Sequence, residues 1–396
     1  MKCIIASPVG CYPSPAGNAE RVRQVHACLE SLGYEVHFVL CPIQAMSPQF
    51  NEEAMTQVFG SRFHQLDNQP RPLQEKLIRF KRRYYHRIHK TGWLFDFMFA
   101  DGYVSKQSCD AFSHLVNRIE PDLIVLIYGF MSPLVKHISA NCKVVIDAQD
   151  KFSYRNRGIR AAGSEGYWLS LLPYQERYLL SQSDVVLGIQ EQESGYFKRL
   201  LKGKNTEVVT LDLIVAPDQP ETRPNISPVI GFLASGNQHN VNGINRFLDK
   251  VWPIITEACP DATLLIAGSV TKHLTTHTPN VELLGWVENL ADFYSRCRLI
   301  VNPCETGSGL KIKTIEAVGF GIPVVSTPCG AAGVEFLLPV ENRCQLTSKA
   351  FAERCISMLL NQQDAQLIAV QSFALLQKRV AENHRQLQIL LQYPLV

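Results

Sequence analysis

A segment in the carboxyl-terminal third of the chain carries glycines, lysines and a glutamate at a spacing that suits a phosphorylated ligand. Residues 306–321 read TGSGLKIKTIEAVGFG. Gly307, Ser308 and Gly309 form a small-residue loop after an apolar run. A helix is predicted to start near Leu310, and its first N–H groups, at the positive end of the helix dipole, suit an anion. The segment therefore predicts a phosphate site.

Three charged residues of this helix, which is predicted to end at Gly319, suit a nucleotide. Lys311 and Lys313 lie in the first turn, where the dipole disfavours cations, so a multiply charged phosphate would compensate them. Glu316 follows about 9 Å beyond the loop, which is near the separation of a diphosphate from its ribose, and a ribose diol would supply the donors that this carboxylate needs. The alternative is a plain helical connection in which Lys313 and Glu316 form an i,i+3 ion pair.

Short apolar runs alternate with helical patterns in both halves of the chain. The first half has such runs at 3–9, 35–40, 122–128, 143–147 and 184–189. The second half has them at 229–234, 262–268, 298–303 and 322–327, and residues 350–393 read as helix. Strand–helix alternation favours parallel sheets, whose carboxyl-terminal edges bind ligands. The predicted fold class is α/β, with a ligand cleft between two similar domains.

A proline-rich stretch divides these halves. Four prolines fall within one polar stretch: Pro217, Pro220, Pro224 and Pro228. We expect an N-terminal Rossmann-like domain at 1–212, a linker at 213–228, a C-terminal Rossmann-like domain at 229–378 and a final helix at 379–396.

The composition excludes several classes of protein. With 46% hydrophobic and 19% charged residues, the 396-residue chain is not of the disordered class. A net charge of +3 gives no global case for nucleic acid, and no apolar run approaches the ~18 residues of a membrane span. The twelve cysteines include no Cys-x-x-Cys pair, and the apolar stretch 3–9 is too short for a signal peptide. We therefore expect reduced thiols in a cytoplasmic protein.

Other catalytic motifs are missing from the sequence. No GxGxxG follows the first predicted strand, no P-loop surrounds Gly203 and Lys204, and no GxSxG is present. His273 and His277 have helical metal-ligand spacing, but they lie in a Thr-rich stretch that favours a solvated loop. No Asp-x-Asp motif suits a divalent cation on a diphosphate, so no metal site is predicted.

One run is strongly basic. Residues 76–90 read KLIRFKRRYYHRIHK, and further aromatic residues follow up to 99. The simpler interpretation is a solvated helix face. The sharper hypothesis is a contact of 76–99 with anionic membrane or with a lipid-linked, pyrophosphate-bearing acceptor. No module that reads nucleic acid accompanies the run.

The segment 306–321 resembles the signature of glycosyltransferase family four, the retaining glycosyltransferases of the GT-B fold. That signature is G-x-G-x-(K/R)-x-K-x-x-E-A followed by G-x-P-V-V. The matching positions here are Gly307, Gly309, Lys311, Lys313, Glu316, Ala317, Gly321, Pro323, Val324 and Val325. Segments 13–36, 183–197, 232–269 and 283–303 resemble other parts of the family. The resemblance implies two Rossmann-like domains facing a cleft and a last helix that returns to the N-terminal domain.

The resemblance also implies a donor site in the C-terminal domain. Lys311 and Glu316 would be its catalytic residues, at the diphosphate and the ribose. The remaining donor-binding positions are Gly17, Asn18, Gly236, Asn237, Trp286, Val287, Leu290, Gly307, Ser308, Gly309 and Leu310. Trp286 suits a stacking platform or a core position equally well. Gln149 and Asp150 would contact the sugar or the acceptor, although a structural cap is the simpler role for Asp150.

The chain departs from the family pattern at three places. Ser308 stands where many relatives have an acidic residue, and Gln149 stands where a histidine is common. No Arg or Lys occurs in 235–243, where many relatives have both. Gln149 can hydrogen-bond a hydroxyl but cannot take a proton.

The function that the resemblance implies is sugar transfer from a nucleotide-diphosphate sugar to a glycan, glycolipid or lipid-linked acceptor, with retention of anomeric configuration. Cell-surface polysaccharide biosynthesis is the expected setting, without a prosthetic group or a metal. The alternatives are a GT-B sugar-nucleotide epimerase, an inverting transferase, or a catalytically silent nucleotide-binding module.

Overall fold

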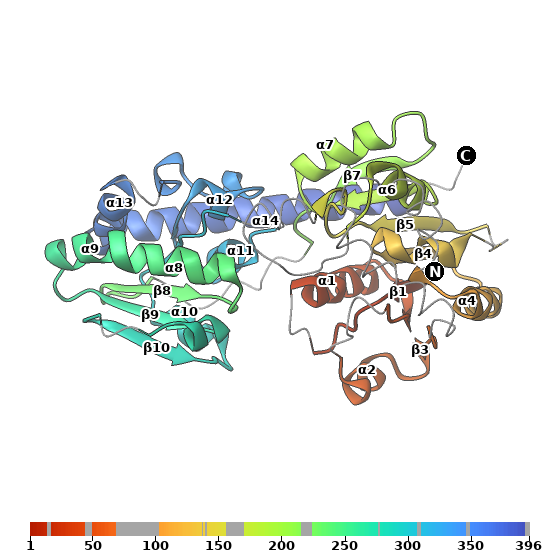
Figure 1. Ribbon diagram of the computed structural model, residues 1–396, viewed down its shortest axis with the longest axis horizontal. Coiled ribbons are helices and arrows are strands. Elements are labelled where there is room, and N and C mark those ends of the chain that lie inside the picture. The colour runs from red at the N-terminus through yellow and green to blue at the C-terminus, as the bar shows by residue number, and fades with distance from the viewer. Residues whose placement is uncertain are drawn as a thin grey trace, which may run out of the picture. The chain divides into compact units, whose positions relative to one another are not determined.

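The chain forms two compact units, each with its own parallel sheet (Figure 1). The computed structural model describes residues 1–13, 17–43, 50–68, 103–136, 138, 141–155, 170–214, 224–275, 278–306, 310–345 and 349–392. Unit 1 comprises Met1–Ile214 and His384–Val396, and unit 2 comprises Val215–Asn383. The predicted α/β class with two parallel-sheet domains is confirmed. The basic run 76–99 and residues 215–223 of the predicted linker lie outside the described residues.

Unit 1 is built on seven parallel strands in the order β3-β2-β1-β4-β5-β6-β7. They are β1 (Lys2–Ser7), β2 (Glu35–Leu40), β3 (Phe63–Gln65), β4 (Leu123–Ile127), β5 (Lys143–Asp147), β6 (Val185–Gly188) and β7 (Glu207–Thr210). All five residues of β4 are buried, which explains its unbroken apolar sequence LIVLI. The strand order reverses between β1 and β4, and such a point leaves room for a ligand at the carboxyl-terminal edge.

A buried ion pair attaches the first helix of unit 1 to this sheet. Arg21 donates from Nε to the carboxylate of Asp147, the last residue of β5, over 2.9 Å. Its other nitrogens donate to the carbonyl oxygens of Asp212 and Leu211. The helices are α1 (Gly17–Ser31), α2 (Glu52–Phe59), α4 (Lys106–Ile119), α6 (Pro173–Leu180) and α7 (Glu191–Leu200).

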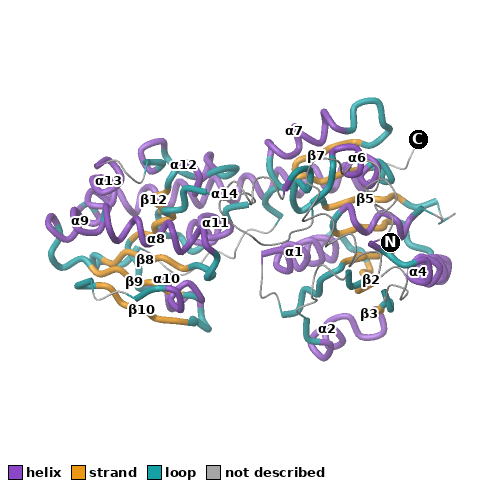
Figure 2. Tube along the Cα trace, viewed as in Figure 1, coloured by secondary structure: helices purple, strands orange, loops and turns teal. Residues whose placement is uncertain are grey.

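Unit 2 is built on five parallel strands in the order β10-β9-β8-β11-β12. They are β8 (Val229–Leu233), β9 (Thr263–Ala267), β10 (Val281–Gly285), β11 (Leu299–Asn302) and β12 (Val324–Ser326). The helices are α8 (Gln238–Lys250), α9 (Trp252–Ala258), α10 (Leu290–Ser295), α11 (Ile312–Gly319), α12 (Pro328–Ala331) and α13 (Lys349–Leu360), and Figure 2 shows how they alternate with the strands. The order reverses between β8 and β11, so the loops after these strands flank the expected ligand position.

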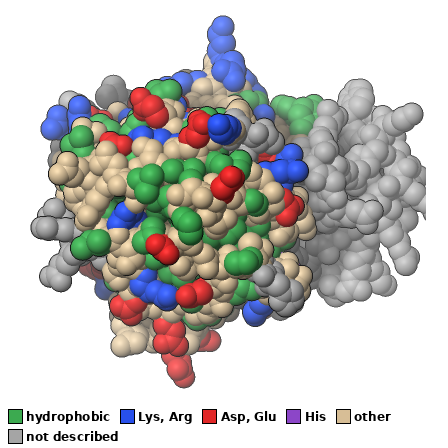
Figure 3. Space-filling model, turned by 90° about the vertical axis from the view of Figure 1, so that its left-hand side faces the viewer, with side chains coloured by type: hydrophobic (Ala, Val, Ile, Leu, Met, Phe, Trp, Pro, Cys, Tyr) green, Lys and Arg blue, Asp and Glu red, His purple; other side chains and the backbone are tan. Residues whose placement is uncertain are grey.

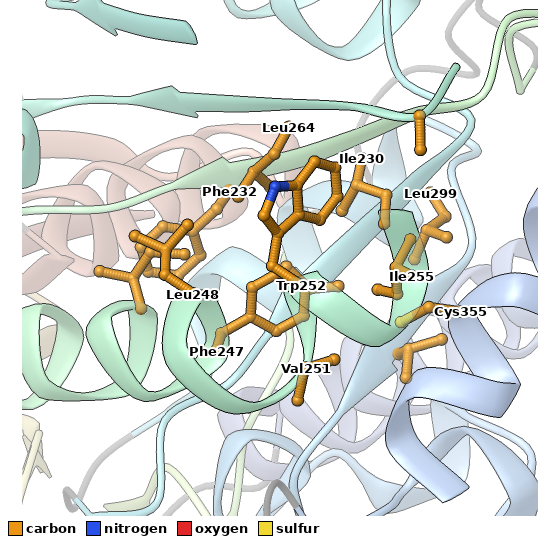
Figure 4. Packing of buried hydrophobic residues seen from close by; sticks show 14 of the residues in the cluster. Ile230, Phe232, Phe247, Leu248, Val251, Trp252, Ile255, Leu264, Leu299 and Cys355 are labelled. Carbon is orange, nitrogen blue, oxygen red and sulfur yellow. The ribbon is translucent and has the colours of Figure 1, made fainter. Parts of the chain in front are cut away.

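The core of unit 2 holds α8 and α9 against this sheet. Trp252 and Phe247 are almost fully buried and meet Phe232 and Leu264 of the strands (Figure 4). The indole Nε1 of Trp252 donates to the Pro279 carbonyl oxygen over 3.3 Å, so its polar atom is satisfied. This packing determines where the amino-terminal end of α8 lies.

The sequence did not predict three edge strands: β3, β7 and β10. Each is short, and most of its residues are only partly buried or exposed. Because an edge strand does not need a continuous apolar run, the pattern that identified the central strands was missing.

The last helix, α14 (Gln362–Gln392), has 31 residues and contributes to both units. Its carboxyl-terminal part belongs to unit 1, where Lys143 of β5 donates from Nζ to the Leu390 carbonyl oxygen. The ring of His384 hydrogen-bonds the Ile214 carbonyl oxygen in the same unit. No described helix is long and apolar enough to cross a membrane.

The described cysteines are free thiols, and charges of both signs mix on one face of the described surface. The twelve cysteines form no disulfide, and nine of them are buried. On the face drawn in Figure 3, acidic and basic side chains are interspersed, in keeping with the small net charge of +3.

Candidate functional site

The predicted phosphate-binding helix is α11, in the connection between β11 and β12 of unit 2. It begins at Ile312, two residues later than predicted. Lys311 is the cap residue, and its carbonyl oxygen accepts from the N–H groups of Thr314 and Ile315 over 2.9 and 3.1 Å. Leu310 precedes it and is partly buried. Gly307, Ser308 and Gly309 lie outside the described residues.

Lys313 has partners inside unit 2. Its ammonium group donates to Oδ1 of Asn240 on α8, lies 3.3 Å from Sγ of Cys304, and stands 5.3 Å from the ring centroid of Phe232. Burial lowers the pKa of Lys313. Within unit 2 a buried amide, a sulfur and an aromatic face thus receive the charge of Lys313. Compensation of both lysines by a bound phosphate stays a prediction.

Glu316 is held by a tyrosine. The hydroxyl of Tyr294, on α10, donates to Oε2 of Glu316 over 2.8 Å. The Tyr294 ring is buried and stacks on Phe320 with 4.5 Å between ring centroids. Burial and the nearby carboxylate raise the pKa of Tyr294 well above its ordinary value, so its hydroxyl remains the donor. The alternative ion pair between Lys313 and Glu316 is not formed in this described segment, since both side chains have other partners.

The predicted loop residues Gly236 and Asn237 lie at the amino-terminal end of α8. Asn237 caps this helix by accepting from the N–H of Asn240 over 3.0 Å, and the Gly236 N–H donates to Oγ of Ser269. A Cβ on Gly236 would lie 2.6 Å from the ring of His273 and 3.0 Å from the Ser269 carbonyl oxygen, so a larger residue would displace that ring. This end of α8 therefore has a fixed backbone.

Two contacts join α8 to the chain leading into the glycine loop. Nδ1 of His239 lies 2.7 Å from Oγ1 of Thr306, which is the last described residue before that loop. A Cβ on Gly243 would lie 2.8 Å from the Pro303 carbonyl oxygen, which shows how closely α8 approaches the end of β11. The amino-terminal end of α8 and residues 303–306 thus lie together at the carboxyl-terminal edge of β8 and β11.

The predicted base-binding residues follow β10. Trp286 is 78% exposed and is therefore not a core residue. Val287 and Leu290 are partly buried, and Asn289 caps α10 by accepting from the Ala291 N–H. The same short helix thus carries Leu290 at its start and Tyr294, the partner of Glu316, near its end.

In unit 1, Asn18 lies beside the strand-order reversal between β1 and β4. Gly17 is the first residue of α1 and is exposed. The Asn18 side chain lies near the hydroxyl of Tyr128, the residue that follows β4, and acts to lower the pKa of that hydroxyl. Tyr128 has a positive φ of 68°, which side-chain-bearing residues adopt rarely, and burial raises its pKa to about 12. Asn18 and Tyr128 join the ends of α1 and β4.

Gln149 and Asp150 form a tight turn after β5. The Asp150 N–H donates to the Ala148 carbonyl oxygen over 2.7 Å, and Gln149 between them has a φ of 60°, which is the rare and strained form of the γ-turn. Asp150 pairs with Arg155 over 2.9 Å and accepts from the Lys151 N–H. Gln149 is buried, and its Nε2 has no hydrogen-bond partner among the described residues.

Glu193 was missed by the sequence analysis. It lies in the first turn of α7, and its Oε2 is buried without a partner in the part of the chain that the structure describes. Burial, assisted by the charges of Asp150 and Glu176, raises the pKa of Glu193 to about 8. The only sequence signal was an acid close behind an apolar strand, in QEQES. A carboxyl group with such a pKa beside a strand end is typical of functional sites.

The described residues contain no group of three His, Cys, Asp or Glu side chains that would suit a metal ion. The ring of His273 lies against Gly236, while His277 lies outside the described residues.

Comparison with known protein families connects the geometry of unit 2 to a function. Residues 227–361 match the family described as glycosyl transferases group 1. The matched residues all lie in unit 2, which is therefore the part of the chain that is similar to the group 1 glycosyltransferases. The match includes α8, α10 and α11, the three helices that position Asn237, Tyr294 and Glu316. The predicted relationship to the group 1 glycosyltransferases is confirmed.

The whole chain resembles solved structures at low sequence identity. Sucrose-phosphate synthase from Thermosynechococcus elongatus has a TM-score of 0.65 at 15% identity, over 98% of both chains. HepE of Anabaena in complex with UDP-glucose has a TM-score of 0.62 at 13% identity, over 98% of this chain and 99% of that one. A mutant of TarM of S. aureus, in complex with UDP, alpha-GlcNAc-glycerol and fondaparinux, has a TM-score of 0.63 at 9% identity. The match covers 99% of this chain and 100% of that one. The predicted GT-B fold is thereby confirmed.

One curated relative matches a short stretch of the chain. Over 106 residues the chain is 29% identical to an uncharacterized 44.6 kDa protein in the cps region of Klebsiella pneumoniae. That stretch covers 24% of this chain and 27% of the relative.

We expect Tyr294→Phe to destabilise unit 2 by about 1–2 kcal/mol, because it removes the only hydroxyl that this ring offers to the Glu316 carboxylate. Urea unfolding of the full chain measures this loss. Tyr34→Phe, at another buried tyrosine ring, is the matched control and should cost less. Equal effects of the two substitutions would contradict the importance of this hydrogen bond.

We expect the free energy of unfolding to fall as pH rises from about 5 to 8, because folded Glu193 keeps a proton that the unfolded chain releases from about pH 4.5. Glu193→Gln cannot ionise and should remove this part of the decline. The variant should exceed the native chain in stability by at least about 1 kcal/mol at pH 8 and match it near pH 5.

Urea unfolding at both pH values provides the measurement. Glu191→Gln, at an exposed position of the same helical turn, is the control and should leave the slope unchanged. A Glu193→Gln variant with the native slope would show that Glu193 is ionised in the folded chain. Asp147, Asp150, Glu176 and Arg155 are the charged groups that act on Glu193, and all are unchanged in both variants.

Proposed function

We propose that the chain is a retaining glycosyltransferase that moves a sugar from a nucleotide-diphosphate sugar to a glycan, glycolipid or lipid-linked acceptor. The observation that carries the proposal is the arrangement of α11 within the part of the chain that is similar to the group 1 glycosyltransferases. Lys311 stands at the start of this helix, and Glu316 is oriented by Tyr294 one turn further on. A cation before a carboxylate at this spacing suits a diphosphate followed by its ribose.

In this mechanism the protein stabilises the leaving group. Lys311 and the N–H groups at the start of α11 would offset the negative charge that develops on the departing diphosphate. Glu316 would accept hydrogen bonds from the ribose hydroxyls and hold the nucleotide in register. No nucleophilic side chain and no metal ion take part in this proposed mechanism. Activity that survives a chelator would support a mechanism without a metal ion.

The relatives support the donor and acceptor classes of this proposal. HepE of Anabaena forms a complex with UDP-glucose, and TarM forms one with UDP and alpha-GlcNAc-glycerol. The relative from Klebsiella pneumoniae is encoded in a cps region. We therefore propose a role in cell-surface polysaccharide biosynthesis. In this proposal the N-terminal domain (1–212) binds the acceptor and the C-terminal domain (229–378) binds the donor, with Gly17, Asn18, Gln149 and Asp150 on the acceptor or sugar side.

The proposed location is the cytoplasm, with a peripheral contact at the inner face of the membrane through residues 76–99. Seven Lys or Arg side chains within 76–90 provide the charge for such a contact. Sedimentation with vesicles containing anionic lipid tests it, and binding that is unchanged after charge reversal in this run would contradict it.

A donor screen tests the class of reaction. Thermal shift and donor hydrolysis with UDP-, GDP-, dTDP- and ADP-sugars should identify one base that stabilises the chain and releases nucleotide. The anomeric configuration of the product separates a retaining from an inverting transferase, and isomerised donor would indicate an epimerase. A chain that binds nucleotide and turns over no donor would be a catalytically silent module.

We expect Lys311→Ala to lower kcat by about 100-fold or more, because the loss of one preorganised charge at the leaving group costs about 10²–10³ in rate. The thermal midpoint should change little, since this residue only begins α11. Steady-state turnover of the donor found in the screen measures the effect. Lys250→Ala, at an exposed lysine ending α8, is the control, and near-normal turnover of Lys311→Ala would contradict the mechanism.

A further inference from the structure

The carboxyl-terminal edge of unit 1 contains buried polar atoms that have no hydrogen-bond partner among the described residues. Gln149 is 8% exposed and Gln190 is 6% exposed, and the Nε2 atom of each has no partner. Oε2 of Glu193 and Oδ1 of Asp147 are likewise buried without a hydrogen-bond partner among the described residues. A buried polar group without a hydrogen bond is unfavourable for folding, so four of them in one place require an explanation.

The topology of the sheet brings these groups to one place. β5 and β6 are neighbouring parallel strands, with Asp147 paired to Leu187. Gln149 follows the end of β5 by two residues, and Gln190 follows the end of β6 by two residues. The Ala148 N–H donates to the Leu187 carbonyl oxygen over 3.0 Å, which keeps the two strand ends together beyond the ladder. Glu193 lies in the helical turn that begins immediately after Gln190.

The chemistry of these atoms is that of a hydroxyl-binding surface. The Nε2 groups of Gln149 and Gln190 are donors, and each amide also carries an acceptor oxygen. The Glu193 carboxyl group, whose pKa burial raises to about 8, holds a proton near neutral pH and can donate or accept. A sugar hydroxyl is likewise donor and acceptor at once, so a vicinal diol would satisfy such a set.

The local charges favour a neutral ligand. Asp147 is paired with Arg21, and Asp150 is paired with Arg155. The Glu176 carboxylate accepts from the Phe152 and Ser153 N–H groups and from the Tyr196 hydroxyl. Lys151 stands 4.1 Å from the centroid of the Tyr196 ring. Because the named carboxylates are paired or hydrogen-bonded within unit 1 and Glu193 is neutral, a neutral ligand suits this place better than an ion.

We propose that Gln149, Gln190 and Glu193 form a carbohydrate subsite in unit 1 that binds hydroxyl groups of a neutral pyranose. This inference rests on the proposed function for the class of ligand, and it extends that function by assigning Gln190 and Glu193 as specificity-determining residues. The subsite recognises sugar without any contribution from the nucleotide.

Saturation-transfer NMR on the full chain tests the subsite with five probes: the methyl α-glycosides of glucose, galactose and mannose, then glucosamine and methyl phosphate. At least one neutral glycoside should receive saturation at pH 7. Gln190→Met and Glu193→Leu should each weaken that binding at least tenfold. Glu193→Gln should retain it, because a neutral amide replaces a neutral carboxyl group of similar shape.

Stability separates a ligand site from a structural role. Since Gln190→Met removes a buried donor without a partner in the described chain, its thermal midpoint should equal or exceed that of the native chain. Gln192→Met, at an exposed glutamine of the same helix, is the matched control and should leave both binding and midpoint unchanged. A lower midpoint for Gln190→Met would overturn the proposal.

Three other outcomes would also overturn it: no saturation of any glycoside, saturation of glucosamine or methyl phosphate alone, or equal losses in Gln190→Met and Gln192→Met. Thermal shift with UDP and GDP on the same preparations tests the proposed function separately. A chain that binds nucleotide but no glycoside would overturn only the subsite. A chain that binds a glycoside through Gln190 but no nucleotide would overturn only the glycosyltransferase proposal.

Discussion

The buried amide of Asn240 determines how the parts of unit 2 meet. Its Nδ2 donates to the Ser235 carbonyl oxygen in the loop after β8, and its backbone N–H donates to the capping Asn237. Its Oδ1 receives the ammonium of Lys313 from α11 and the thiol of Cys304 from the end of β11. One side chain thus joins both strand ends at the reversal in strand order. Since its donor and acceptor atoms are both used, α8 and α11 have a fixed relation within unit 2.

In unit 1 a charged side chain, and not an amide, joins the first helix to the sheet. There a guanidinium group, that of Arg21, joins α1 to the end of β5 and to the chain at Leu211 and Asp212. Around that satisfied pair the amides of Gln149 and Gln190 have unused donors within the described chain. Unit 2 also contains buried polar atoms without a partner in the described chain, namely Asn302 Oδ1 and Arg343 Nε. What distinguishes unit 1 is that Gln149 and Gln190 follow the ends of two neighbouring strands, β5 and β6.

The sequence predicted central features well and side-chain partners poorly. The strands 35–40 and 143–147 were located to the residue, because a buried parallel strand must be an apolar run. The pattern of residues 306–321 also predicted a helix that ends at Gly319 and carries Glu316, and α11 ends at that residue. The partner of Glu316, however, comes from α10, 22 residues earlier, and the partner of Lys313 comes from α8, 73 residues earlier. Glu193 and Gln190 were missed because burial and lack of a partner arise only when β5, β6 and α7 pack together. No local pattern encodes these tertiary relations.

The buried cysteines have a consequence for the chemistry of the chain. Burial raises the pKa of Cys11 and Cys297 to about 12, so at neutral pH these sulfurs are thiols and not the reactive thiolates. In such positions cysteine serves as a small apolar side chain: Sγ of Cys297, for example, occupies the space that a Cβ on Gly231 would need. A chain can thus accumulate many sulfur atoms while exposing little redox chemistry to its surroundings. Its resistance to oxidants and alkylating reagents is then a property of packing, and it lasts only as long as the fold does.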